Sequence, residues 1–95
     1  MRLRITSRAA ADLAGLWRHV ASTDPVVADR VLARIDAGIR MLSRFPQAAP
    51  ERPDIAPGLR AHPVRPWVIL YRLDPEAVVV VRVLDGRRDP AGWAA

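Results

Sequence analysis

The chain has 95 residues, enough for a single domain, and it has no cysteine, which excludes disulfide bonds, thiolate zinc sites and cysteine nucleophiles. Its formal net charge is +5 and every basic residue is arginine; this suits phosphate or carboxylate partners but is also typical of GC-rich coding. The N-terminus is too charged for a signal sequence and no apolar run approaches the roughly twenty residues of a membrane span, so we expect one cytoplasmic domain over residues 1–95 with no membrane partner.

The first half of the chain predicts a strand followed by two helices. Apolar and polar residues alternate over residues 1–6, as in a half-exposed strand. Ser7 is a plausible N-cap for a helix over residues 8–21, and Asp24-Pro25 begins a second helix that reaches about Phe45. Because only two or three residues join these helices, we expect an antiparallel hairpin. Its inner faces are expected to carry Ala9, Leu13, Leu16, Trp17 and Val20 in the first helix and Val27, Val31, Ile35, Ile39 and Leu42 in the second.

The second half predicts a loop and three strands. Residues 46–58 contain four prolines and a glycine, which indicates an extended loop. Residues 59–64 form a strand that Pro63 favours at a sheet edge. Residues 67–73 and 77–84 are apolar almost throughout, so we expect an antiparallel pair of central strands covered on both faces. The predicted fold class is therefore α+β, in the order β-α-α-β-β-β, with a helical hairpin packed on a small, mostly antiparallel sheet.

Charged and aromatic residues of the last third are the candidates for function. Arg82 interrupts an apolar strand and needs a partner such as Asp74 or Asp85, or a role at the end of the sheet. Strict alternation would put Arg82 on one face with Val78, Val80 and Leu84, and would put Val79, Val81 and Val83 on the other face. Arg87 and Arg88 are expected in solvent, and Trp93 is the best candidate for an exposed aromatic contact.

Most catalytic chemistry finds no support in the sequence. Neither His19 nor His62 has a second ligand at metal-binding spacing, so no metal site is expected. There is no glycine-rich phosphate loop, no pair of catalytic carboxylates and no serine in a nucleophile setting. We therefore expect no cofactor, and a hydrolase or a kinase is disfavoured.

An ordered series of short motifs resembles the ParE/RelE superfamily of bacterial toxins, and within it the ParE (plasmid-stabilisation) branch. The early motifs are Ala10-Ala11-Asp12-Leu13-x-x-Leu16-Trp17 and Asp24-Pro25-x-x-Ala28-x-Arg30. The later motifs are Pro57-Gly58-Leu59-Arg60, Pro63-Val64, Trp67-Val68-Ile69-Leu70-Tyr71-Arg72 and Val81-Arg82-Val83-Leu84-Asp85-Gly86-Arg87-Arg88-Asp89. The resemblance covers residues 3–90, and it implies the RelE/ParE-like version of the predicted fold.

The resemblance implies the toxin of a type II toxin–antitoxin system. Toxins of the ParE branch poison DNA gyrase, whereas those of the RelE branch cut mRNA on the ribosome. Arg60 and Arg82 occupy positions at which the ribonuclease branch keeps phosphate-binding arginines. However, the chain has no lysine and its single tyrosine, Tyr71, lies inside a strand, so general acid–base catalysis lacks its usual groups. Gyrase poisoning is therefore the favoured function; a ribosome-dependent mRNA interferase and an inactive antitoxin-binding module remain the alternatives.

The resemblance also implies a partner, a ParD-like antitoxin whose disordered acidic C-terminal segment folds onto the toxin in a hetero-oligomer. We expect Leu13, Trp17 and Val20 to line the groove for this segment, and Arg72 and Arg82 to form ion pairs with it. The residues expected to contact gyrase are Arg87, Arg88 and Trp93.

Overall fold

The computed structural model describes residues 1–93 and confirms the predicted order of elements. Residues 46–58 form turns and a single bridge between Glu51 and Arg60, as expected for a loop. The regular elements are β1 (Arg2–Ile5), α1 (Ser7–Ala21), α2 (Pro25–Arg44), β2 (Arg60–Val64), β3 (Trp67–Leu73), β4 (Ala77–Asp85) and the short 3₁₀ helix η1 (Pro90–Gly92).

The strands form one sheet in the order β1-β4-β3-β2. The apolar strands β3 and β4 are central and antiparallel to each other, as their composition predicts. Strand β2 lies at the edge of the sheet. Pro63 has no backbone N–H to donate, and such a residue is tolerated in an edge strand, which has a neighbouring strand on one side only. Strand β1 pairs with β4 in parallel, from Arg2 opposite Ala77 to Ile5 opposite Val80, so the sheet is mixed with mostly antiparallel pairs.

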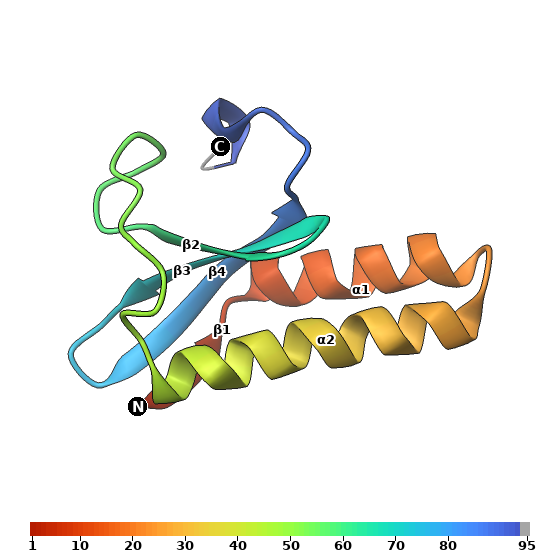
Figure 1. Cartoon of the computed structure of the whole chain (residues 1–95), viewed down its shortest axis with the longest axis horizontal. Coiled ribbons are helices and arrows are strands. Elements are labelled where there is room, and N and C mark those ends of the chain that lie inside the picture. Colours follow the sequence, from red (N-terminus) through yellow and green to blue (C-terminus); the bar gives the residue numbers. More distant parts are fainter. Residues whose placement is uncertain (94–95) are drawn as a thin grey trace.

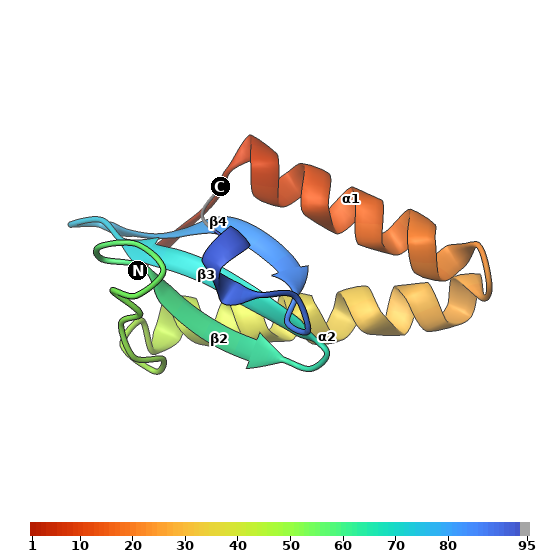
Figure 2. The same cartoon turned by 90° about the horizontal axis from the view of Figure 1, so that it is seen from above.

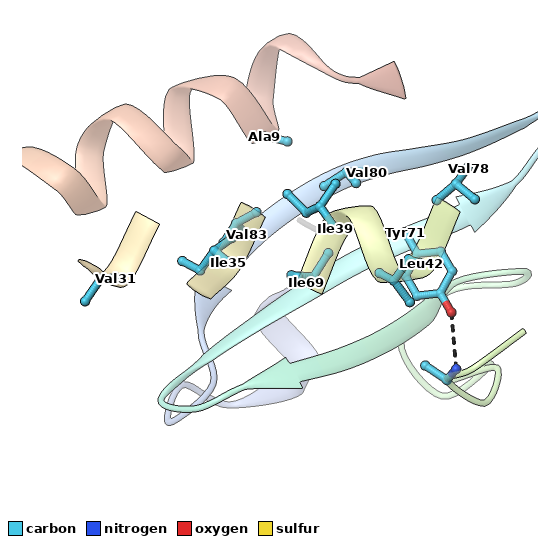
Figure 3. Close-up of a cluster of buried hydrophobic side chains, with 11 residues drawn as sticks. Ala9, Val31, Ile35, Ile39, Leu42, Ile69, Tyr71, Val78, Val80 and Val83 are labelled. Carbon is cyan, nitrogen blue, oxygen red and sulfur yellow. Dashed lines mark hydrogen bonds between the residues drawn. The ribbon is translucent and has the colours of Figure 1, made fainter. Parts of the chain in front are cut away.

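Two layers cover the sheet (Figure 1). Helices α1 and α2 pack on one side, which we call the helix face. The end of the loop, with Ile55 and Ala56, and the segment after β4 lie on the other side, which we call the loop face, whereas Ala49 near the beginning of the loop belongs to the helix-face core. The buried cluster of the helix face (Figure 3) consists of Ala9, Val31, Ile35, Ile39, Leu42, Ala49, Ile69, Tyr71, Val78, Val80 and Val83. The smaller cluster of the loop face consists of Leu59, Val68, Leu70, Leu84 and Trp93.

The start of α1 differs from the prediction by one residue. Thr6, not Ser7, is the N-cap: its backbone is extended, and its hydroxyl accepts a hydrogen bond from the Ala9 N–H at 3.1 Å. The same hydroxyl donates to the Val81 carbonyl at 3.1 Å, which ties the helix start to β4. The second helix begins as predicted, with the Asp24 carboxylate accepting from the first free backbone N–H groups.

A β-bulge corrects the predicted alternation in β4. Leu70 lies opposite Arg82, but its neighbour Tyr71 lies opposite Val80, so one extra residue is accommodated in β4. As a consequence, Val83 joins Val78 and Val80 in the helix-face cluster. The prediction that Val83 faces away from Val78 and Val80 is therefore wrong, because strict alternation does not survive an inserted residue.

The helical hairpin is longer than the sheet that it covers. Its closed end, where α1 turns into α2, projects beyond the strands (Figures 1 and 2). Val27 lies at this end and is 40% exposed, so the prediction that it belongs to the inner face is wrong, and Ala28 is buried instead. The remaining predicted inner-face residues of α2 are buried: Val31, Ile35, Ile39 and Leu42.

Candidate functional site

Arg82 is held by a carboxylate of the first helix. Its Nε and Nη2 atoms donate to the Asp12 carboxylate at 2.7 and 3.0 Å, and both side chains are largely shielded from solvent. These hydrogen bonds raise the pKa of Arg82 above its ordinary value, against the opposing effect of burial. The partners considered from the sequence, Asp74 and Asp85, are therefore wrong; the actual partner lies 70 residues earlier in the chain.

Asp12 also completes the edge of the sheet. Strand β1 ends at Ile5, opposite Val80, so the outer edge of β4 has no strand partner beyond that point. The Asp12 carboxylate accepts a hydrogen bond from the backbone N–H of Val83 at 3.0 Å. The Asp12 carboxylate thus neutralises the guanidinium of Arg82 and accepts the hydrogen bond of an edge N–H group. Arg82 therefore contributes to the fold in the absence of any ligand.

Arg60 is likewise engaged in the fold. Its Nη1 atom donates to the carbonyl of Ala49, and its guanidinium lies 3.7 Å from the Glu51 carboxylate. The neighbouring Tyr71 is fully buried; its hydroxyl donates to the Pro46 carbonyl at 2.9 Å and accepts from the Ala49 N–H at 3.3 Å (dashed in Figure 3). Arg60 and Tyr71 together fasten the beginning of the loop to the sheet.

The C-terminal candidates are divided between solvent and core. Arg87 is exposed and donates from Nε and Nη2 to Asp85 at 3.0 and 2.7 Å, and this pairing holds the pKa of Asp85 well below its usual range. Arg88 is also exposed. Trp93 is only 6% exposed, so the expectation of an exposed aromatic is wrong. The reason is that η1 folds back and places Trp93 in the loop-face cluster, which leaves Arg87 and Arg88 available for a partner.

The residues expected to bind an antitoxin lie in two different environments. Leu13 is partly buried against the helix-face core. Trp17 is 36% exposed, and its indole N–H donates to Asp29 of α2 at 3.0 Å. Val20 and the exposed Val27 line a shallow pocket of about 430 Å³ at the closed end of the hairpin. Of these candidates, Trp17 is exposed and Val20 lines the pocket with Val27, whereas Leu13 contributes mainly to the core.

Arg72 belongs to a separate charged cluster at the far end of the sheet. Its Nε atom lies 3.3 Å from one oxygen of Asp74, and Arg4 of β1 lies 3.3 Å from the other oxygen. Two guanidinium groups therefore share one carboxylate, which leaves an excess of positive charge near β1. Arg72 is held by Asp74 of the β3–β4 turn and Arg82 by Asp12 of α1, so the structure does not bring these two candidates into one site.

No catalytic constellation emerges from the described part of the chain. Among residues 1–93, no three His, Asp or Glu side chains gather closely enough to hold a metal ion. His62 is half-buried on the helix face, where burial lowers its pKa.

Comparisons with known proteins agree with this architecture. Residues 3–90 match the family described as "ParE toxin of type II toxin-antitoxin system, parDE". A relative named "Toxin ParE3" from Caulobacter vibrioides is 44% identical over 81 residues, which cover 84% of this chain and 81% of the relative. The chain belongs to the ParE toxin family. A solved structure described as "Chromosomal ParDE TA system from P. aeruginosa" superposes with a TM-score of 0.79 at 25% identity, covering 90% of this chain and 95% of the other.

Membership in the ParE family confirms the resemblance drawn from the short motifs, and the structural match confirms the predicted fold class.

Asp12 is the residue that sequence reasoning missed as the partner of Arg82, although a signal for it existed. It follows Ala9 by three residues and precedes Leu16 by four, which places a carboxylate on the buried stripe of the first helix.

Neither helix of the described residues is long and apolar enough to cross a membrane.

Proposed function

We propose that this ParE-family chain acts by poisoning DNA gyrase and is neutralised by an antitoxin with an acidic C-terminal segment. The observation that carries the proposal is the family match, which extends from residue 3 to residue 90. The relative from Caulobacter vibrioides is named as a toxin, and the structure from P. aeruginosa is described as a toxin–antitoxin system. An antitoxin partner follows for this chain by similarity to both.

The arginine contacts support binding as the mode of action. A ribonuclease site would need free phosphate-binding groups and a general acid or base. Arg82 is instead paired with Asp12, and Arg60 bonds the Ala49 carbonyl. The Tyr71 hydroxyl is buried and bonded on both sides, so it has no route to a substrate. These contacts favour gyrase poisoning over mRNA cleavage.

The closed end of the helical hairpin is the proposed antitoxin site. Trp17 and Val27 are 36% and 40% exposed there, and Val26 is 59% exposed. Exposed apolar side chains grouped on one surface are typical of a protein interface. Arg18 and Arg30, which are exposed on the same two helices, add positive charge that suits an acidic segment.

Trp17→Ala tests the antitoxin site against a control at the opposite end of α2. Phe45→Ala is the matched control, because Phe45 is a 60% exposed aromatic residue just after that helix. We expect Trp17→Ala to weaken binding of the cognate antitoxin by about tenfold or more, since buried interface aromatics dominate affinity. Calorimetry with the purified antitoxin measures both variants. Weaker binding by Phe45→Ala with no change for Trp17→Ala would place the antitoxin elsewhere.

The proposed target is tested by two parallel assays on the purified chain. One incubates it with gyrase, supercoiled plasmid and ATP and scores trapped cleavage complexes; the other incubates it with translating ribosomes and scores mRNA cuts. We expect cleaved plasmid and intact mRNA, with cleavage reduced when Arg87 and Arg88 are both replaced by alanine. Replacing Arg18 and Arg30 removes the same charge elsewhere and serves as the control. Cut mRNA with intact plasmid would overturn the gyrase proposal.

A further inference from the structure

A pocket of about 610 Å³ opens on the loop face, away from the antitoxin site proposed above. Three different segments supply its arginines: the loop before β2, the turn between β2 and β3, and the segment after β4. Its lining residues, all within residues 1–93, include no acidic side chain. The residues that matter are Arg52, Arg65 and Arg87, the strand residues Pro63 and Val68, and Trp93.

Two of the three arginines are fixed in place by carboxylates outside the pocket lining. Arg52 donates from Nε and Nη2 to Asp54 at 3.0 and 2.8 Å. Arg87 donates from the same two atoms to Asp85 at 3.0 and 2.7 Å. Because this side-on pairing uses only one edge of the planar guanidinium, the Nη1 edge of each arginine keeps donors for a second anion.

The third arginine has no ion pair with any residue in the described part of the chain. The Arg65 side chain is exposed, whereas its backbone carbonyl accepts a hydrogen bond from Nη2 of Arg34 at 3.0 Å. This hydrogen bond attaches the β2–β3 turn to α2 and leaves the guanidinium of Arg65 uncommitted. The pocket thus combines two partly neutralised cations with one that is not neutralised.

Trp93 adds an aromatic side chain to the same pocket lining. Its side chain is buried, and its indole Nε1 finds no hydrogen-bond acceptor within residues 1–93. Beside it, Pro63 and Val68 provide an apolar surface.

We propose that this pocket binds a nucleotide through its phosphate, with the sugar and base lying over the apolar strand residues. The pocket volume lies within the usual range of about 300–1,000 Å³ for small-molecule sites. A phosphate offers more oxygens than a single carboxylate, so it matches three guanidinium groups better than one acidic side chain does. No histidine, lysine, tyrosine or carboxylate lines the pocket, so the nucleotide is bound and not cleaved.

The nucleotide can come from two sources, a free nucleoside phosphate or one unit of a single strand. The test therefore uses two probes with the full chain: adenosine 5′-monophosphate in calorimetry and a fluorescein-labelled hexathymidylate in anisotropy. We expect saturable binding that Arg65→Ala weakens by about tenfold or more, because a charge-assisted contact is lost. Arg44→Ala, which removes the same charge from an exposed position at the end of α2, is expected to change affinity less than about twofold.

The salt dependence of oligonucleotide affinity provides a second test of the phosphate contact. For the oligonucleotide, Arg65→Ala should reduce the slope of log affinity against log salt by about one, as expected for one lost phosphate contact. Tighter binding of the oligonucleotide than of the mononucleotide indicates a strand, and equal binding indicates a free nucleotide; both outcomes support the pocket. Circular dichroism checks that the variants fold, and Arg52→Ala provides a second pocket variant.

Three outcomes would overturn the proposal. The first is no saturable binding of either probe. The second is an equal loss of affinity in Arg44→Ala and Arg65→Ala. The third is a hexaglutamate peptide that binds more tightly than both nucleotide probes in an Arg65-dependent manner. Gyrase is absent from these experiments, so nucleotide binding can fail while gyrase poisoning stands, and the reverse also holds.

Discussion

The two faces of the sheet are covered in different ways. On the helix face, two regular helices bury a continuous apolar cluster that includes the fully buried Ile35 and Leu42. On the loop face, a proline-rich loop and a short C-terminal segment cover a smaller cluster, and open pockets remain between them. The chain therefore concentrates its buried apolar packing on the helix face and leaves open pockets on the loop face.

The difference shows how a 95-residue domain can keep a firm core and still offer binding surfaces. A helix packs a stripe of side chains at regular spacing against the sheet, whereas an irregular segment contacts the sheet at only a few points. Here those points include the Tyr71 hydroxyl, which bonds Pro46 and Ala49, and the Trp93 side chain. Irregular cover of this kind is easier to displace because its opening breaks few contacts.

Leu42→Ala is expected to lower the free energy of unfolding more than any other change that compares the two faces. Leu42 is fully buried on the helix face, and its truncation should lower the free energy of unfolding by about 2–5 kcal/mol. Leu59→Ala is the matched change on the loop face and should cost clearly less, because Leu59 borders an open pocket into which the loop can relax. Denaturant unfolding of both variants measures the difference. Equal losses would show that the two faces are packed equally well.

Asp12→Ala should have the next largest effect. Removing the carboxylate leaves Arg82 without its partner and the Val83 N–H without its acceptor, so we expect a loss of about 2 kcal/mol in the free energy of unfolding. Asp36→Ala is the control, since Asp36 forms an exposed pair with Arg40 on α2 that is worth at most about 0.5 kcal/mol. If the two variants lost the same amount, the contact between α1 and β4 would be no stronger than a surface pair.

His62→Gln should give the smallest effect, visible only as a change in pH dependence. Burial lowers the pKa of His62 in the folded chain, so the unfolded chain binds its proton more readily. The stability that neutral His62 provides is complete above the ordinary histidine pKa of about 6.5 and decreases as the pH falls through the lower folded value. The variant should therefore lose less stability than the wild type between pH 7 and 5 in thermal unfolding. His19→Gln on the exposed side of α1 is the control; a wild-type pH profile for His62→Gln would contradict this interpretation.

The regular parts of the fold could be predicted from the sequence because local patterns determine them. The cap at Asp24, the proline in the edge strand and the two apolar runs each indicated the element that the structure contains. The family could be recognised for the same reason, since its motifs occur in order along the chain.

The positions of the candidate site residues depend on contacts between distant segments, so the sequence predicted them less well. The bulge opposite Leu70 and Tyr71 changed which residues of β4 share a face of the sheet. The local sequence pattern does not indicate where such an extra residue is inserted. The partner of Arg82 lies on the first helix, beyond the neighbours from which it was sought. Trp93 is buried because η1 folds back over the sheet, which depends on space left by the loop and not on the C-terminal sequence itself.

The pairing of β1 with β4 has a consequence for how the chain is made. Within residues 1–93, β1 pairs only with β4, the strand that is synthesised last of the four, and Leu3 lies opposite Val78. Helices α1 and α2 can form early from local contacts, but the sheet that they cover must wait until β4 has been synthesised. A nascent chain that lacks β4 therefore cannot form the loop-face pocket, so this pocket is completed later than the helical hairpin.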